Sequence, residues 1–300
     1  MRGGALGTPV ARCPVIQDPG HAAPGGAPAS VRAYFDTRKE TVVSSRFHLF
    51  AASAVSALVV SGCTGVVAVK NVESDKFGYL SKTFSVQSVP SAVASQIAAQ
   101  DHGPLPFHRM VLSVTPQIES APVGVVPQNY RSSWTIINVG GPYVQFLDEQ
   151  TSNGVDTRQD YGVSYRNLFM VRAQTMLMNR TNSSLVMEAK ALQTFTPVSL
   201  GGAPGGSLEY HYTWGNQAQL ANFSDLAIHC AYGARYPASR LNARLVGEAQ
   251  ELNCDHVNKN GVVSDHSTRA LLVHYGVAVI TRNQTATAAV NFKIDNVSID

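Results

Sequence analysis

Apolar and polar residues alternate with a period of two along much of the chain beyond residue 100. Between residues 161 and 177 the apolar positions of one parity are Tyr161, Val163, Tyr165, Phe169, Val171, Ala173 and Leu177. Such alternation is typical of a strand with one buried and one wet face. It predicts one long strand here, a turn at 179–182 and a returning strand over 185–195. Further strands are predicted over 109–115, 133–147, 208–214, 224–230, 243–254, 268–281 and 290–295.

One segment has a helical period instead. Val89, Val93 and Ile97 recur at intervals of four, and residues 101–104 (Asp-His-Gly-Pro) end the pattern, which predicts a short helix over about residues 90–100. Many short strands separated by turn residues favour an antiparallel β-sandwich or barrel-like sheet with one or two short helices. The glycine-rich segment 201–206 is expected to be a long surface turn. Residues 63–300 are therefore expected to form a single mainly β domain.

The first 62 residues follow a different pattern. Residues 1–41 are rich in Gly, Pro and Ala without apolar periodicity, so we expect disorder there. Basic residues then precede an apolar run from Phe47 to Val60, and Ser61-Gly62-Cys63 follows. A basic region, an apolar region of about 7–15 residues and small residues at a cleavage site predict a secretory signal peptide, placed at residues 42–62. The run is shorter than the roughly 20 apolar residues of a membrane-spanning helix.

The four residues Val60-Ser61-Gly62-Cys63 resemble the lipobox of bacterial lipoproteins, in which an aliphatic residue and two small ones precede a cysteine. The resemblance covers only the signal segment. It implies that Cys63 receives a diacylglyceryl group, becomes the new N-terminus after cleavage and is then N-acylated. Thr64 in place of Asp at the next position implies sorting to the outer membrane, where the protein would be held by its lipid on the periplasmic face.

The position of this signal departs from the family pattern, since about 40 residues precede it. A misplaced start codon would explain the departure, with translation beginning near Val42 or Val43 and residues 1–41 never made. Two or more acyl chains anchor a protein stably to a membrane surface without spanning it. Residues 64–69 look strand-like and no long stalk follows Cys63, so the domain is expected to lie close to its membrane.

Composition removes one class of partner. The chain of 300 residues is 44% apolar and 14% charged, with a formal net charge of +3. That excess lies in residues 1–62, because residues 63–300 contain equal numbers of basic and acidic side chains. A nucleic-acid binder is expected to carry a basic face, so the sequence argues against a DNA or RNA partner.

The cysteines can be assigned one by one. Among the four, Cys13 lies in the N-terminal segment and Cys63 is the expected lipid site. Cys230 and Cys254 remain, each at the end of a predicted strand. In an oxidising compartment an even pair of this kind predicts a disulfide.

The sequence contains none of the catalytic signatures that we can test. Gly-x-Ser-x-Gly and His-Glu-x-x-His are absent, and the glycine loop 201–206 lacks the Lys-Ser/Thr of a nucleotide-binding loop. No catalytic, cofactor-binding or metal-binding residue is therefore predicted.

The densest group of titratable residues lies between Cys254 and His266. Asn260-Gly261 favours a two-residue hairpin turn, which would place Asp255 opposite His266 and His256 opposite Asp265. Neighbouring pairs point to opposite faces of a sheet, so the four side chains should not converge on one metal ion. A carboxylate beside each imidazole should raise the pKa of both histidines, provided that burial does not dominate.

Aromatic residues provide the one hint of a binding surface. The candidates are Tyr130, Arg131, Trp134, Tyr210, Tyr212 and Trp214. Tyr, Trp and Arg are enriched at binding hot spots, although an alternating aromatic strand is more often simply part of the core.

Two hypotheses follow. The first is a lipid-anchored envelope protein with a structural or binding role and an envelope protein as a possible partner. The alternative is an envelope hydrolase whose catalytic residues meet only in three dimensions; a deep pocket that pairs a histidine with a carboxylate and a nucleophile would favour it.

Overall fold

The computed structural model describes residues 66–120 and 129–300, all within one compact unit. In this part of the chain twelve antiparallel strands form a closed barrel, in which each strand pairs with its neighbours in sequence and β1 pairs with β12. The strands are β1 (Arg109–Ser120), β2 (Tyr130–Asn138), β3 (Tyr143–Ser152), β4 (Val155–Tyr165), β5 (Phe169–Leu177), β6 (Met187–Phe195), β7 (Ser207–Asn216), β8 (Ser224–Pro237), β9 (Glu248–Asn258), β10 (Val263–Leu272), β11 (Val277–Thr285) and β12 (Ala289–Ile299). The predicted mainly β, antiparallel, barrel-like fold is confirmed. The predicted signal peptide, Cys63 and residues 1–41 lie outside the described residues.

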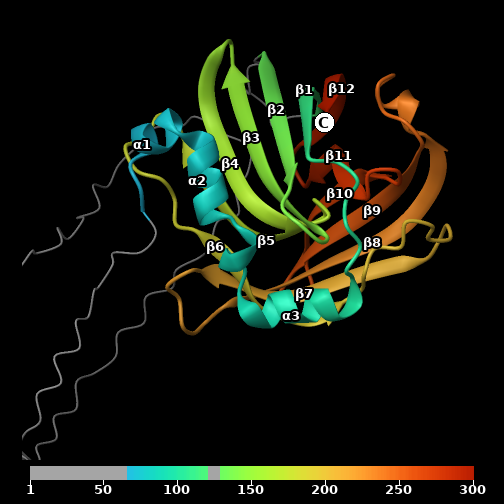
Figure 1. Cartoon of the computed structure of the whole chain (residues 1–300), viewed down its shortest axis with the longest axis horizontal. Helices are drawn as coiled ribbons and strands as arrows, with labels where there is room; N and C mark the ends of the chain where they lie inside the picture. The colour runs from blue at the N-terminus through green and yellow to red at the C-terminus, as the bar shows by residue number, and fades with distance from the viewer. Residues whose placement is uncertain (1–65, 121–128) are drawn as a thin grey trace, which may run out of the picture. The chain divides into compact units, whose positions relative to one another are not determined.

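Helices precede the barrel in sequence and pack against it. They are α1 (Val69–Ser74), α2 (Lys76–Thr83), the 3-10 turn η1 (Val86–Ser88) and α3 (Ser91–Gln100), with a second 3-10 turn, η2 (Ala238–Arg240), between β8 and β9. The helix predicted near residues 90–100 is confirmed as α3, which packs against β6, while α2 packs against β3 (Figure 1). Val69 begins a helix, so the strand-like interpretation of residues 64–69 is wrong at that position. No helix in the described ranges has the length and apolar character needed to cross a membrane.

Three segments predicted as single strands are hairpins. The segments 133–147, 161–177 and 268–281 turn back at 139–142, 166–168 and 273–276. At the second of these, Leu168 N donates to Tyr165 O at 2.8 Å, and both Arg166 (φ 48°) and Asn167 (φ 53°) are left-handed. Two central residues with positive φ match the right-handed twist of the flanking strands, as in a type I′ turn. Only Asn167 signals this turn in the sequence, and the apolar alternation runs on past it.

The barrel is closed unevenly around its circumference. β5 and β6 pair only through Arg172 with Glu188 and Ala173 with Met187. β11 and β12 pair only over residues 282–284 and 289–291. We call these two short pairings seams. At the β5–β6 seam side chains also hold the strands together, since Arg172 Nη1 lies 3.0 Å from Glu188 Oε2 and donates to the Ser88 carbonyl of η1 at 2.9 Å.

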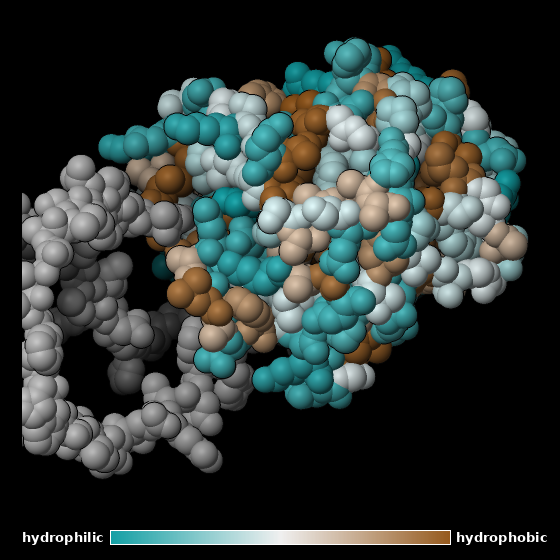
Figure 2. Space-filling view, turned by 60° about the horizontal axis from the view of Figure 1, so that its bottom comes forward, coloured by the Kyte–Doolittle hydropathy of each residue, from teal (hydrophilic) through white to brown (hydrophobic). Residues whose placement is uncertain are grey.

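The apolar side chains form two separate clusters. One joins α2 and α3 to β4, β5 and β7–β9, and the other joins β1, β2 and β12 to the ends of β9–β11. Leu271 and Ala278 belong to the first cluster, whereas their neighbours Leu272 and Val277 belong to the second. The end of β10 and the start of β11 are therefore buried on both faces. The surface in Figure 2 is mostly polar, with hydrophobic residues in separate patches.

The β4–β5 turn is fixed by a buried ion pair. Arg166 contacts Asp101, just after α3, through two hydrogen bonds of 2.6 and 2.9 Å, the paired geometry that makes arginine–carboxylate contacts strong. Tyr165 donates its hydroxyl to the same carboxylate at 2.6 Å. Burial alone would raise the pKa of Asp101, but the hydrogen bonds from Arg166 and Tyr165 outweigh it and hold that pKa below its ordinary value.

The same turn is bound to the opposite wall of the barrel. Ala278 N donates to Arg166 O and Asn167 Nδ2 donates to Ala278 O, both at 2.9 Å. The buried Arg269 guanidinium of β10 donates to the carbonyls of Asn167 and Leu168 at 3.2 Å. The tip of the β4–β5 hairpin is thus locked onto β10 and β11.

Removing Asp101 should strongly destabilise the protein. Asp101→Ala leaves the Arg166 guanidinium buried without its counter-charge, and breaking a buried pair in this way costs about 3–5 kcal/mol of unfolding free energy. Urea unfolding monitored by circular dichroism would measure the loss. The exposed pair of Arg282 with Glu119 provides the control, because Glu119→Gln should leave the midpoint unchanged. Equal midpoints for both variants would contradict the role given to this ion pair.

Candidate functional site

Three of the six residues predicted as a binding surface are buried. Tyr210 is 0% exposed and stacks on Phe169 at a ring-centroid distance of 5.3 Å, and Tyr212 meets the same ring edge-on at 4.8 Å. Trp134 is 3% exposed and packs against Phe292 at 5.5 Å. The binding-surface prediction is therefore wrong for these three side chains, because alternate residues of β2 and β7 point into the hydrophobic clusters.

The other three predicted residues lie nearer the surface but are not adjacent in the fold. Trp214 is half-buried near the end of β7, where it meets Tyr212 edge-on. Tyr130 and Arg131 begin β2, Tyr130 half-buried and Arg131 exposed. These positions do not form a single aromatic patch.

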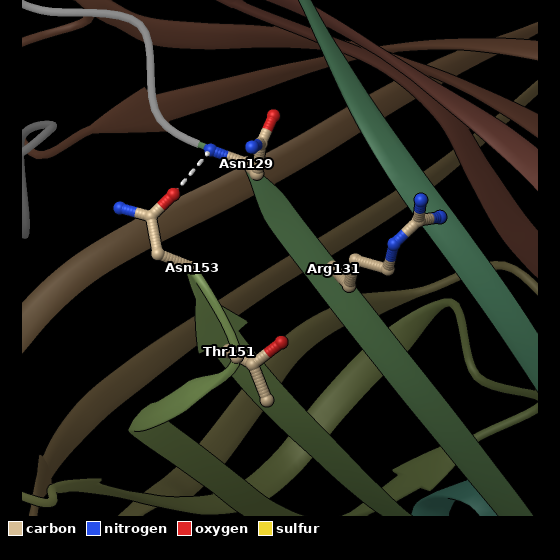
Figure 3. A pocket seen from close by; sticks show the side chains of 5 residues that line it. Asn129, Arg131, Thr151 and Asn153 are labelled. Atoms are coloured by element: carbon tan, nitrogen blue, oxygen red, sulfur yellow. Dashed lines mark hydrogen bonds between the residues drawn. The ribbon is translucent and has the colours of Figure 1, made fainter.

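Arg131 lines a shallow polar cavity of about 540 Å³ at the ends of β2 and β3 (Figure 3). Its lining residues are Asn129, Arg131, Thr151, Asn153 and Gly154. Asn129 N donates to Asn153 Oδ1 at 3.4 Å, while Arg131 extends toward β1, where it donates to Thr115 Oγ1 at 2.8 Å and lies 3.6 Å from Asp295. The charge of Arg131 is therefore partly satisfied by the protein, and the cavity offers only scattered hydrogen-bonding groups to a ligand.

The predicted disulfide is confirmed. Cys230 of β8 and Cys254 of β9 are direct cross-strand partners, and their sulfurs are bonded in the interior of the barrel. Both residues are almost completely buried, with 2% and 1% exposure. The bond therefore staples two strands that already pair and presents no reactive thiol to solvent.

The 255–266 hairpin has the predicted partners but a different turn. Asp255 pairs with His266 and His256 pairs with Asp265. Only Gly261 takes a positive φ, of 74°, and Asn258 N bonds to Val262 O at 3.0 Å, so the turn is one residue longer than predicted. A bulge between Val263 and Asp265 then shifts the register back by one residue, which restores the predicted pairs.

The two His–Asp pairs lie in different environments, on opposite faces as predicted. His266 Nδ1 is exposed and lies 2.5 Å from Asp255 Oδ1. His256 faces the interior, 3.8 Å from Asp265, where burial and the neighbouring Arg269 guanidinium lower its pKa to about 4. The expectation that carboxylates raise the pKa of both histidines is therefore wrong for His256, because desolvation outweighs the attraction of Asp265 and Asp255.

The outer member of this hairpin belongs to a longer row that the sequence did not reveal. Glu209 pairs with His229, His229 with Asp255, and Asp255 with His266, so acids and imidazoles alternate across β7, β8, β9 and β10. Cross-strand pairs of opposite charge stabilise adjacent strands. In the described ranges no group of three His, Cys, Asp or Glu side chains is arranged to hold a metal ion. The row therefore presents both carboxylate and imidazole groups on the outer face of the barrel, where they can form hydrogen bonds with basic or acidic groups of a partner.

Asp148 is the carboxyl group with the most perturbed acidity. It is buried on β3 directly opposite Asp160 of β4. Burial, helped by the Asp160 charge, raises the pKa of Asp148 to about 6, against a hydrogen bond from Gln150 at 2.8 Å. A carboxyl group of this acidity can exchange protons near neutral pH, but it lies in the barrel wall and lines neither the cavity at Arg131 nor the one at Arg244 and Tyr275.

Comparisons with known proteins yield a structural likeness and no family. No family model matches the chain. No curated protein matches it either. Among solved structures, a beta-barrel-like protein of the domain of unknown function DUF1849 from Brucella abortus is similar, with 6% identity and a TM-score of 0.41 over 65% of this chain and 99% of that one.

Asp148→Asn should stabilise the protein in a pH-dependent way. The pKa of Asp148 is raised in the folded state, so the stability contributed by its protonated form is present below about pH 4 and is lost as pH rises through about 6. Above pH 7 the variant should exceed wild type by on the order of 2–3 kcal/mol, the equivalent of about two pKa units. Urea midpoints between pH 4 and 8 would measure this difference. The exposed Asp156→Asn is the control, and a constant difference across the pH range would contradict the argument.

His256→Gln should remove part of the acid sensitivity of the fold. The pKa of His256 is lowered on folding, so its neutral form supports full stability above about pH 6.5, and stability is lost as pH falls from there toward 4. Melting temperatures at pH 7.5 and 4.5 should therefore differ less in His256→Gln than in wild type. Gln284→Ala, an exposed substitution that changes no titratable group, should keep the wild-type difference. Titration of the His256 ring above pH 6.5 by NMR would show that the ring is not buried as described.

Proposed function

We propose that the chain is a lipoprotein, acylated at Cys63, whose β-barrel is held at the surface of an envelope membrane and binds an envelope partner on its exterior. The observation that carries this proposal is the apolar run Phe47–Val60, which Ser61-Gly62-Cys63 follow directly. An apolar region with a small-residue cleavage site directs export, and a cysteine at the cleavage site is where the resembled family receives its lipid. The outer membrane is the expected destination, because Thr64 follows the cysteine.

The disulfide supports export. Cys230 and Cys254 are bonded in the folded domain. Disulfides form and persist in the periplasm and outside the cell and are rare in the cytosol. A signal peptide and a buried structural disulfide in one chain fit the same compartment.

The packing of the barrel supports a role on its exterior. Tyr165, Phe169, Phe195 and Tyr210 fill the interior at ring-centroid distances between 5.0 and 6.1 Å. The turn at residues 166–168 adds backbone to the same region. Protein interiors packed in this way leave no room for a ligand without rearrangement. Recognition is therefore assigned to the outer surface and its edges.

The balance of charges on the outer surface limits the class of partner that it can bind. Residues 63–300 carry equal numbers of basic and acidic side chains, and the row of Glu209, His229, Asp255 and His266 alternates in character. Such a surface suits a protein partner with mixed polarity better than a nucleic acid, which selects a basic face.

Cys63→Ala should abolish lipidation. Cells given a radioactive fatty acid should label wild-type protein and leave Cys63→Ala at background, because the thioether and the new N-terminus both depend on that cysteine. The matched control is Thr64→Ser, which changes the neighbouring residue, keeps the cysteine and should retain the label and the membrane fraction of wild type. Mature wild-type protein should also show no free thiol when denatured without reductant. Equal labelling of wild type and Cys63→Ala would contradict the proposal.

A further inference from the structure

Three connections form one edge of the barrel. They join β5 to β6 (residues 178–186), β7 to β8 (217–223) and β9 to β10 (259–262), and they lie together because every second connection between neighbouring antiparallel strands falls at the same end of the barrel. Gln217 N donates to Val186 O at 2.9 Å, which joins the first connection to the second. Leu226 pairs with Asn258, which places the third beside the second. We call these three connections the loop edge.

Exposed apolar side chains are concentrated at the loop edge. Ten large hydrophobic residues are exposed in the described ranges, and five of them belong to the loop edge or the strand ends beside it: Leu177, Leu185, Leu220, Val262 and Val263. Leu220 is 92% exposed, far more than any other. Scattered exposed apolar residues need no explanation, but a group on one edge marks an interaction site. Figure 2 shows hydrophobic patches on several parts of the visible face, some of them on the left, the side on which α1 lies in Figure 1.

The charged residues within the three connections, Arg180 and Lys259, are both basic. Both are exposed, and Lys70 is exposed at the start of α1. The connections themselves contain no acidic residue. Acids near this edge are Asp225, which lies beside His211 at the start of β8, and Glu73 and Asp75 on and just after α1. Cations beside exposed apolar tips match a membrane surface, where basic side chains meet anionic headgroups and apolar ones enter the acyl boundary.

The N-terminal end of the described chain lies at the same edge. Val67 N donates to Ser183 Oγ at 3.1 Å and Ser183 N donates to Val67 O at 2.9 Å, while Ala68 forms a β-bridge with Asn182. Val66 itself is 51% exposed. Cys63 is three residues earlier, so it is at most about 10 Å from Val66 even when the chain is extended.

From these observations we infer that the loop edge docks on the surface of the membrane that holds the lipid, with Leu220 inserted at the boundary between headgroups and acyl chains and Arg180 and Lys259 facing anionic phospholipids. The inference rests on the proposed acylation of Cys63, which would place the lipid beside this edge. The opposite end of the barrel, with the locked β4–β5 turn and the β6–β7 connection, then points away from the membrane.

Quenching by brominated lipid tests this orientation. The acylated full-length protein would be reconstituted into vesicles of brominated phosphatidylcholine with phosphatidylglycerol, and Leu220→Trp compared with wild type to subtract the emission of Trp134 and Trp214. The added emission at position 220 should fall by more than about half, because an inserted side chain lies within reach of the acyl bromines. The matched control, Leu200→Trp on the β6–β7 connection, should not be quenched, and Val246→Trp serves if that variant is unstable. Lys259→Glu should weaken the quenching at position 220, and Arg240→Glu at the opposite end should not.

The outcomes separate this inference from the proposed function. Acylated protein that floats with the vesicles but shows no quenching at position 220, or equal quenching at positions 220 and 200, overturns the docking while the lipid anchor stands. Protein that neither carries a fatty acid nor floats overturns the proposed function, and the docking with it. If Lys259→Glu leaves the quenching at position 220 unchanged, the proposed contact between Lys259 and anionic lipid is wrong, and the insertion of Leu220 is still supported.

Discussion

The fold depends on the buried contact between Arg166 and Asp101. It joins the residue after α3 to the β4–β5 turn, and that turn is bound in the same place to Gly276 and Ala278. A charged pair with 5% and 9% side-chain exposure is tolerated only when geometry and further hydrogen bonds compensate for lost hydration. Here Tyr165 and the Gly276 carbonyl provide those bonds. These contacts fix the position of the β4–β5 turn, and the turn in its place positions the strands on both sides of it.

This locked tip explains why the barrel has two cores. The ends of β10 and β11 support the turn, so side chains on both faces of these strands are buried: Leu271 in one cluster and Leu272 in the other. Strands buried on both faces need continuous apolar sequence rather than alternation. The run Ala270-Leu271-Leu272 and the run Val277-Ala278-Val279 have that character. Because side chains and backbone fill the centre of the barrel in this way, a partner can contact the protein only on its outer surface and edges.

The two ends of the barrel consequently have different properties. One end holds the ion pair, the turn and many backbone hydrogen bonds, and it resists movement. The other end holds the loop edge, where apolar tips such as Leu220 have no partner among the described residues and where the chain arrives from the direction of Cys63. Leaving a leucine exposed forgoes about 2 kcal/mol of burial free energy, and a group of exposed apolar side chains on one edge is typical of an interaction site. The short seam between β5 and β6, held by Arg172 and Glu188, lies next to this end, so docking and barrel closure involve neighbouring residues.

The sequence by itself determined what depends on neighbours along the chain. Alternation predicted most strands, the spacing of Val93 and Ile97 predicted α3, and Asn260-Gly261 led to the partners of Asp255 and His256 although the turn is longer than expected. The tertiary structure alone decided what depends on closing the barrel: the turn at Arg166 and Asn167, the meeting of Arg166 with Asp101, and the row that adds Glu209 and His229 to Asp255. Periodicity gives the same signal on either side of a tight turn, and it does not say which face becomes the interior. Burial then fixes which histidine is desolvated, and so the pKa of His256 could be judged only after the strands were placed.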